Sequence, residues 1–224
     1  MTSRVIAIDG PAGSGKSTTA KAVARRLGLA HLDSGALYRA ATLAALDAGA
    51  EMSGTAIVAL AKSLPVRLDL TDDGFRPEVA GVDVSTEIRT DRVTERVSEV
   101  SALPELRVWA NEELRSAAAS HPRGVVMDGR DIGTVVFPDA AVKVFLVANG
   151  EERARRRLLQ MGLSTDSGSV RKKTEDMAER DRKDSSRAVA PLTQADGAVL
   201  VDTTNLDFEE QVDRVVEMGR KAFS

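Results

Sequence analysis

A glycine-rich segment near the N-terminus has the residue types and spacing of a phosphate-binding loop. Gly10-Pro11-Ala12-Gly13-Ser14-Gly15-Lys16-Ser17 matches the pattern G-x-x-x-x-G-K-S/T and is followed by Thr18. The glycines let backbone N–H groups approach phosphate oxygens, and a helix starting near Lys16 presents its positive end to the same anion. Lys16 would reach the β- and γ-phosphates, and the Ser17 hydroxyl would coordinate Mg²⁺. The segment therefore predicts binding of ATP or GTP.

Arginine and aspartate side chains gather in further segments of the chain. Segments 33–39 and 129–133 each follow an expected strand, where α/β sheets bind ligands, and a later charged helix places positions i, i+4 and i+7 on one face. Arginine forks bind phosphate oxygens bidentately, so arginines beside a phosphate-binding loop predict a second, phosphorylated substrate. The residues concerned are Asp33, Arg39, Arg130, Asp131, Arg180, Asp184 and Arg187, with Arg153, Arg156 and Arg157 one segment before the last three.

The sequence has no obvious catalytic base, which agrees with a phosphate acceptor. The second pKa of a phosphate monoester is about 6, so its attacking oxygen is already ionised at neutral pH. Catalysis would then consist of alignment and charge neutralisation by Mg²⁺, Lys16 and arginines. Two alternatives stay open for these side chains: solvated salt bridges on a charged helix, and helix caps at Asp33 and Asp131.

The hydrophobic pattern predicts strands that alternate with helices. Short apolar runs indicate buried strands, and apolar positions with helical spacing indicate the helices between them. This alternation predicts an α/β chain with a mostly parallel sheet, interrupted by a small antiparallel insert at 63–96. The expected strands are 5–8, 30–32, 125–127, 142–147 and 198–201, and the expected helices are 16–27, 35–48, 55–63, 104–119, 151–159, 170–184 and 208–221, with a break at 162–169.

Composition narrows the class of protein. The 224 residues suit one compact domain, and a 3% aromatic content predicts an aliphatic core. The formal net charge of -3 argues against nucleic-acid binding driven by overall charge, and the lack of cysteine excludes disulfides. The apolar run at the N-terminus is too short for a signal peptide, and no segment has the length to span a bilayer, so we expect a cytoplasmic protein with no membrane partner.

Four segments together resemble the bacterial cytidylate kinases, and the resemblance extends over essentially the whole chain. They are 8–18, 33–39 (Asp-Ser-Gly-Ala-Leu-Tyr-Arg), 128–138 (Asp-Gly-Arg-Asp-Ile-Gly-Thr-Val-Val-Phe-Pro) and 187–192 (Arg-Ala-Val-Ala-Pro-Leu). The resemblance implies a three-layer P-loop NTPase core formed by 1–62, 97–150 and 188–224, an insert at 63–96 that binds a nucleoside monophosphate, and a helical lid at 151–187. It also implies transfer of the ATP γ-phosphate to CMP or dCMP, with Mg²⁺.

The resemblance further assigns roles to individual residues. Ser34, Arg107 and Asp131 resemble the residues that read cytosine. Ser98, Arg180 and Asp184 resemble the sugar contacts, while Arg39, Arg130 and Arg187 resemble a clamp on the acceptor phosphate. Arg153, Arg156 and Arg157 lie where the lid arginines of the family close over the transferred phosphoryl group, and the break at 162–169 is a candidate hinge.

Other functions remain open at this stage. A small P-loop kinase acting on another monophosphate or metabolite would share the loop and the arginines, and so would a regulatory module that hydrolyses ATP slowly. The sequence leaves open whether CMP or dCMP is preferred, whether UMP is accepted, and whether Asp33 or Asp128 supports Mg²⁺. We expect a monomer whose partners are small molecules.

Overall fold

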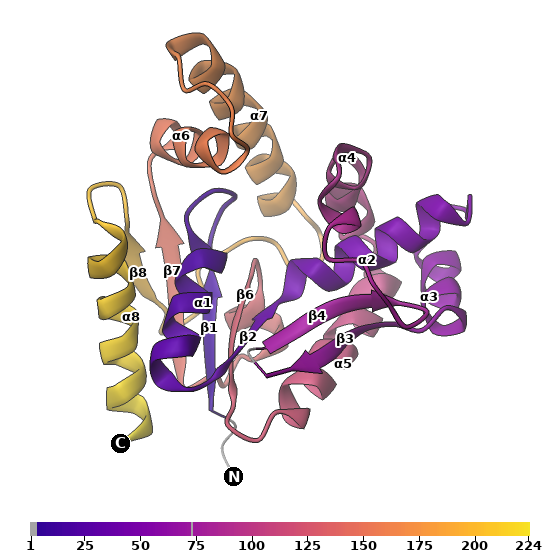
Figure 1. Ribbon diagram of the computed structural model, residues 1–224, viewed down its shortest axis with the longest axis horizontal. Coiled ribbons are helices and arrows are strands. Elements are labelled where there is room, and N and C mark those ends of the chain that lie inside the picture. The colour runs from indigo at the N-terminus through magenta and orange to yellow at the C-terminus, as the bar shows by residue number, and fades with distance from the viewer. Residues whose placement is uncertain (1–3, 73) are drawn as a thin grey trace.

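The computed structural model describes residues 4–72 and 74–224 as helices around one mixed sheet (Figure 1). Five strands run parallel in the order β2 (Ala30–Asp33), β6 (Val125–Gly129), β1 (Val5–Asp9), β7 (Val142–Val147) and β8 (Val199–Asp202). The sheet continues beyond β2 with β4 (Gly74–Val79) and β3 (Val66–Thr71), and β5 (Val82–Asp83) pairs with β4. The predicted mostly parallel sheet is confirmed.

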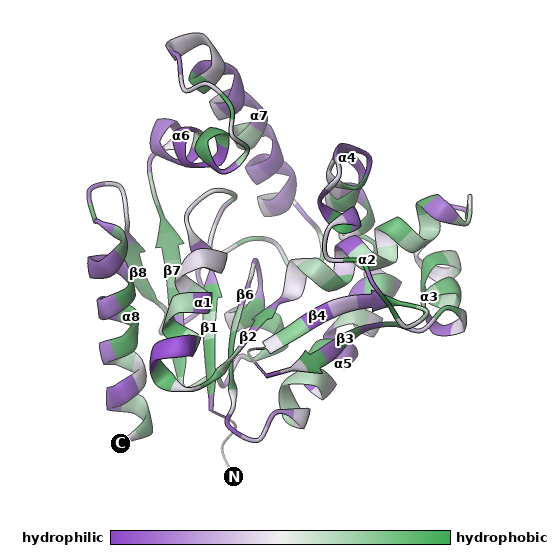
Figure 2. Cartoon of the chain, viewed as in Figure 1, coloured by the Kyte–Doolittle hydropathy of each residue, from purple (hydrophilic) through white to green (hydrophobic). Residues whose placement is uncertain are grey.

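The central strands are buried on both faces, because their apolar side chains alternate between two separate cores. In β1, Val5 and Ala7 belong to one core, and Ile6 and Ile8 belong to the other. Figure 2 shows the resulting apolar centre, with hydrophilic residues along the outer helices.

Each core is covered by its own helices. The core containing Ile6 packs against α1 (Lys16–Leu27) and α8 (Phe208–Phe223). The core containing Val5 packs against α2 (Ser34–Asp47), α3 (Gly54–Ser63), α4 (Asp91–Val100) and α5 (Pro104–Ser120). The two short helical segments are the 3₁₀-helix η1 (Glu87–Arg89) and the π-helix η2 (Ile132–Val136). This arrangement is the three-layer fold predicted from the sequence.

A hairpin of two helices, α6 (Gly150–Gln160) and α7 (Ser167–Ser185), stands outside these layers, above the loop that joins β1 to α1 (Figure 1). The two helices pack through a small apolar cluster of Ala154, Leu158, Val170 and Met177. The predicted break at 162–169 is shorter than expected, because Asp166 accepts the N–H groups of Gly168 and Ser169 and starts α7 at Ser167.

The segment 63–96 contains the predicted antiparallel strands and the start of helix α4, which the strand pattern did not predict and which continues to Val100. Strands β3 and β4 form a hairpin that joins the main sheet where His31 of β2 pairs with Gly74. Helix α4 follows η1 and buries Val93, Val97 and Val100. Across residues 4–72 and 74–224, no helix combines the length and apolar character needed to cross a bilayer.

Candidate active site

The glycine-rich loop lies at the carboxyl end of β1 and leads directly into α1. Gly10, Gly13 and Gly15 have positive φ angles of 149°, 72° and 89°, which residues with a Cβ rarely adopt. A Cβ on Gly10 would collide with the backbone oxygen of Leu146 in β7, so the loop packs closely against the neighbouring strand. Its backbone is therefore shaped by glycine, as a phosphate cradle requires.

Lys16 lies inside this loop rather than on its surface. Only 6% of the residue is exposed, and Nζ donates a hydrogen bond of 2.7 Å to the Pro11 carbonyl oxygen. Burial and the nearby Arg130 guanidinium lower the pKa of Lys16 well below its usual value. A buried ammonium beside another cation is costly, and a bound anion would relieve that cost.

A hydrogen-bonded chain connects the loop to the adjacent strands. The Ser17 hydroxyl donates to Asp128 Oδ2 at 2.6 Å, and His31 Nε2 lies 2.7 Å from Asp128 Oδ1. Burial opposes the charge on both groups, but their hydrogen bond lowers the pKa of Asp128 and raises the pKa of His31. Burial and the neighbouring Asp128 raise the pKa of Asp33, which pairs with Asp128 across β2 and β6.

A second cluster of charge lies beyond β6 and is centred on Asp184 of α7. Asp184 is 1% exposed and accepts hydrogen bonds from Arg130 Nε at 2.9 Å and Arg187 Nη2 at 2.6 Å. Arg187 Nη2 also donates to the Ser101 hydroxyl at 2.9 Å. The cluster therefore joins the segment after β6 to the end of α7, two regions more than 50 positions apart in the chain.

Arg107 and Asp131 form a buried ion pair beside this cluster. Arg107 also donates to the Ser101 carbonyl oxygen at 2.9 Å and lies over the ring of Tyr38 at 5.4 Å. The turn that carries Asp131 is held by Asp9, whose carboxylate accepts the N–H groups of Ile132 at 2.9 Å and Gly133 at 2.7 Å.

Several arginine side chains in this region have a buried hydrogen-bond donor that is not satisfied within the described residues. Among the described residues, the Nε atoms of Arg107, Arg180 and Arg187 are buried without a hydrogen-bond partner. Burial and the neighbouring Arg180 lower the pKa of Arg39 to about 10, and burial and Arg130 lower the pKa of Arg180. Buried polar groups are almost always paired, so crowded arginines with free donors indicate a place for an anionic ligand.

The remaining predicted residues are distributed around these two clusters. The buried Ser34 hydroxyl donates to the Asp128 carbonyl oxygen at 2.7 Å. Arg39 Nη1 donates to the Ile88 carbonyl oxygen at 3.0 Å and to Thr94 at 2.9 Å, so it is tied to the segment 63–96. The Ser98 contact with Arg187 is made by its backbone oxygen, at 3.5 Å.

The lid arginines are not brought together as a group. Arg156 donates to the Thr203 carbonyl oxygen at 2.7 Å and to its hydroxyl at 3.0 Å. Arg157 donates to Gln160 at 2.8 Å, and burial and the nearby Arg89 lower the pKa of Arg157. Arg157 is therefore close to the crowded arginines Arg39 and Arg180, whereas Arg156 contacts the residue that follows β8.

A cavity of about 350 Å³ lies beside the phosphate-binding loop on the Arg156 side. The residues from the loop after β8 and from α8 carry no motif, so the sequence gives no signal that they belong to a site. The cavity is lined by Gly15, Thr18, Glu152, Arg156, Leu206, Phe208 and Gln211.

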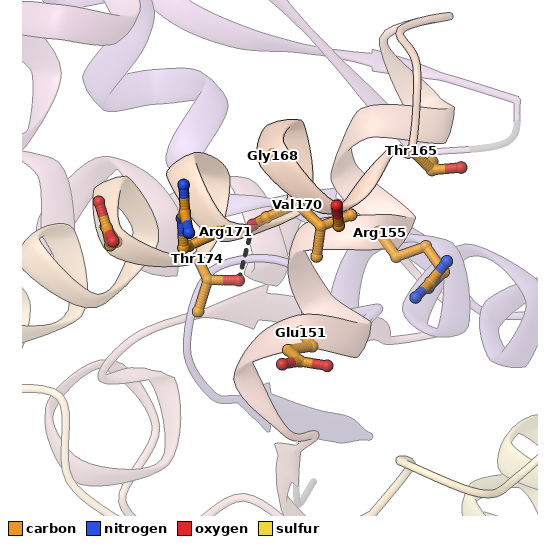
Figure 3. A pocket seen from close by; sticks show the side chains of 9 residues that line it. Glu151, Arg155, Thr165, Gly168, Val170, Arg171 and Thr174 are labelled. Atoms are coloured by element: carbon orange, nitrogen blue, oxygen red, sulfur yellow. Dashed lines mark hydrogen bonds between the residues drawn. The ribbon is translucent and has the colours of Figure 1, made fainter.

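A larger open hollow of about 720 Å³ is lined by residues of α6, of α7 and of the segment that joins them. Figure 3 shows Glu151, Arg155, Arg171 and Thr174 around it, with the Thr174 hydroxyl bonded to the Val170 carbonyl oxygen at 2.9 Å. Its lining includes none of the predicted site residues, and its two arginines are exposed. This hollow is therefore separate from the candidate active site.

Comparison with known proteins identifies similar sequences along nearly the full chain. The family model described as cytidylate kinase matches residues 6–221. The cytidylate kinase of Lactococcus lactis subsp. cremoris is 47% identical over 220 residues, covering 96% of this chain and 97% of that protein. Those of Caldanaerobacter subterraneus (46% over 217 residues, 96% and 94% covered) and Mycolicibacterium paratuberculosis (45% over 221 residues, 97% and 95% covered) are similar to the same extent.

Proposed function

This chain belongs to the cytidylate kinase family, and we propose on that basis that it transfers the γ-phosphate of ATP to CMP or dCMP, giving ADP and CDP or dCDP. One observation supports the proposal beyond the similarity. The glycine-rich loop follows β1, and Arg130, which pairs with Asp184 in the cluster of arginines, follows the neighbouring parallel strand β6, so both lie at the same edge of the sheet. This arrangement suits two phosphorylated substrates that meet between them.

For the donor, we propose that residues 10–18 hold the ATP phosphates. The α1 N-terminus and the loop amides supply hydrogen bonds, and Lys16 supplies charge. The 350 Å³ cavity is the proposed place of the adenine base, between Arg156 and the Leu206–Phe208 segment, because it adjoins the loop at Gly15 and Thr18. This proposal gives Arg156 a role in binding the donor rather than the transferred group.

For the acceptor, we propose that Asp131 and Arg107 read the cytosine ring, with Ser34 beside them. A carboxylate accepts a hydrogen bond from the N4 amino group of cytosine. Uracil has an oxygen at that position, which the carboxylate would repel. The ion pair keeps both side chains in place before the base arrives. Ser98, Arg180 and Asp184 are the proposed sugar contacts, and Arg39, Arg130 and Arg187 the proposed phosphate contacts.

The proposed chemistry needs alignment and charge rather than a base. The acceptor phosphate is already ionised, so Lys16, Arg130, Arg157 and Arg187 need only orient the two phosphates and neutralise the charge that develops. Closure of the hairpin α6–α7 would exclude water, so that ATP is not hydrolysed instead.

We also propose that Mg²⁺ accompanies ATP. The residues suit a hard cation, because the Ser17 hydroxyl lies 2.6 Å from the buried Asp128 carboxylate and Asp33 is its neighbour in the next strand. Ser17 would bind the ion and Asp128 would support its water shell, while the ion would neutralise phosphate charge. Within the described residues, no three His, Cys, Asp or Glu side chains form a metal cage.

The predicted division of the chain follows from these roles. Residues 1–62, 97–150 and 188–224 would form the core, 63–96 would help to hold the monophosphate by orienting Arg39 through Ile88 and Thr94, and 151–187 would form the lid. We also propose that the protein acts on ATP and CMP as a monomer in the cytoplasm.

The direct test is ADP formation with CMP, dCMP, UMP and AMP as acceptors. We expect CMP and dCMP to stimulate turnover most strongly. Replacing Asp131 by Ala should lower kcat/KM for CMP by about 100-fold, because Arg107 loses its buried partner, and should leave the KM for ATP unchanged. A module that only hydrolyses ATP would show the same turnover with every acceptor, and that result would exclude the kinase.

A further inference from the structure

The lid hairpin contacts the phosphate-binding loop at both backbone polar groups of one residue, Ala12. The Ala12 N–H donates to Asp181 Oδ1 at 3.1 Å, and the Ala12 carbonyl oxygen accepts from Arg153 Nη1 at 2.9 Å. Asp181 and Arg153 also form an ion pair with each other, and their side chains are only 18% and 13% exposed. The N–H and the carbonyl oxygen of Ala12 are thus bound by opposite charges, Asp181 from α7 and Arg153 from α6.

Apolar contacts lie next to these hydrogen bonds at Ala12. Ala12 packs against the cluster that joins α6 to α7, and Gly13 lies against the methyl group of Met177. A Cβ on Gly13 would overlap that methyl group and approach the Arg153 carbonyl oxygen at 3.0 Å. The hairpin and the loop therefore fit closely, and the contact depends on glycine at position 13.

The same helix reaches the acceptor cluster. Asp181 follows Arg180, which has a free buried donor, and precedes by three residues Asp184, which holds Arg130 and Arg187. Neighbouring side chains along α7 thus contact the donor loop and the acceptor arginines. A rigid helix that touches both sites is a physical route for coupling them.

We propose that Asp181 is a positioning residue for phosphoryl transfer: by accepting the Ala12 N–H and pairing with Arg153, it fixes α7 to the donor loop and couples ATP binding to the acceptor arginines. This inference rests on the proposed kinase function. Asp181 touches neither phosphate in this scheme, and it acts through the loop backbone and Arg153.

The test compares Asp181→Ala and Asp181→Asn with the unchanged chain. The alanine removes both contacts, and we expect it to lower kcat/KM for ATP by about 100-fold. Asparagine keeps an oxygen for the Ala12 N–H but loses the charge, so its loss should be about 10-fold. The Kd for CMP alone, measured by calorimetry, should stay within about 2-fold of the original value in both variants, because the Asp184 contacts remain.

Coupling supplies the readout that a purely structural role would not move. In the unchanged chain, a non-hydrolysable ATP analogue should tighten CMP binding by about 5-fold or more, and Asp181→Ala should abolish this effect. Glu179→Gln is the matched control, because it removes an exposed carboxylate from the same helix that pairs only with Arg182 and Lys183 among the described residues. It should keep full activity and coupling.

The outcomes separate the two proposals. An unchanged chain that phosphorylates no monophosphate contradicts the kinase function itself. Normal kinase activity together with unaltered kinetics and coupling in both Asp181 variants overturns the positioning role alone. Tighter ATP binding in Asp181→Ala would also overturn it, because the carboxylate would then compete with the nucleotide rather than order the loop.

Discussion

We propose that the donor loop and the acceptor cluster bind the same chemical group, phosphate, by opposite means. The donor loop uses consecutive residues, positive φ angles at Gly10, Gly13 and Gly15, and the start of α1. The acceptor cluster uses side-chain charges brought from α2, α5, α7 and the end of β6, with Asp184 and Asp131 holding the arginines. One site is made of backbone, and the other is made of ion pairs.

This difference determines how each site responds to change. Loop amides have partial charges that no side-chain substitution removes, so the donor loop should keep part of its affinity after most single changes. In the acceptor cluster each buried charge is balanced by a few partners, so removal of one partner leaves another unpaired. We therefore expect donor-side changes to affect catalysis more than binding, and acceptor-side changes to affect both.

The largest effect is expected from Lys16→Ala on the donor side. It removes the one charged side chain of the loop motif, whose proposed role is to stabilise charge that develops during transfer. We expect kcat to fall by about 1,000-fold while CMP binding stays unchanged. Steady-state rates and calorimetry with CMP alone check this. A comparable loss of CMP affinity would break the separation between the two sites.

Asp184→Asn on the acceptor side should have the next largest effect. The change leaves Arg130 and Arg187 buried beside a neutral group, so the free energy of unfolding should fall by about 3 kcal/mol. We expect kcat/KM for CMP to fall by about 100-fold. Denaturant unfolding and kinetics with both substrates measure this, and a larger change in the KM for ATP than for CMP would contradict it.

A pH effect is expected at Asp9, which joins the two regions through β1 and the Asp131 turn. Burial raises the pKa of Asp9 from 3.8 to about 6, although the N–H groups of Gly133 and Ile132 oppose the shift. The folded chain therefore holds this proton more tightly than the unfolded chain. The stability that Asp9 contributes is complete below pH 4 and is lost as the pH rises through 6, by up to about 3 kcal/mol.

Comparison with Asp9→Asn isolates this titration from all others. The difference in unfolding free energy between the unchanged chain and the variant should shift against the unchanged chain between pH 4 and pH 7. Denaturant curves at several pH values measure the shift. A constant difference, or one of opposite sign, would show that the hydrogen bonds from Ile132 and Gly133 outweigh burial.

The same contrast explains what could be predicted from the sequence. The donor loop is local, so its spacing alone located it, and strand and helix periods located the sheet and most helices. Helix α4 was not predicted, because its apolar residues Val93, Val97 and Val100 lie within a segment whose preceding strand pattern indicated an antiparallel insert. Periodicity was present there, but it was outweighed by the neighbouring strands.

The acceptor cluster could be predicted only in part. Charge and spacing on α7 indicated an anionic substrate, but its pairing with Arg130 depends on a contact between distant segments. The positioning groups were harder still: Asp9, His31 and Asp181 act on backbone N–H groups or on other side chains, and no residue pattern identifies such a partner. The cavity beside Arg156 depends likewise on how the loop after β8 folds.

The smallest effect is expected in the hairpin formed by β4 and β5, away from both proposed phosphate sites. Val79 pairs with Val82, so Ala80 and Gly81 form a two-residue turn, and both have positive φ angles (51° and 79°). Such turns favour Asn-Gly, and alanine in this conformation costs about 1 kcal/mol. Ala80→Asn should therefore raise the free energy of unfolding by about 0.5–1 kcal/mol, and Ala80→Val should lower it.

Neither change at Ala80 should alter the KM for CMP, because the turn is exposed and the acceptor cluster contacts the segment 63–96 through Arg39 at Ile88 and Thr94. Thermal unfolding and kinetics of the two variants measure both expectations. A KM that changed together with stability would mean that the hairpin itself shapes the acceptor site. The cluster would then depend on strand geometry as well as on ion pairs, and its contrast with the backbone-built donor loop would be weaker than its contacts indicate.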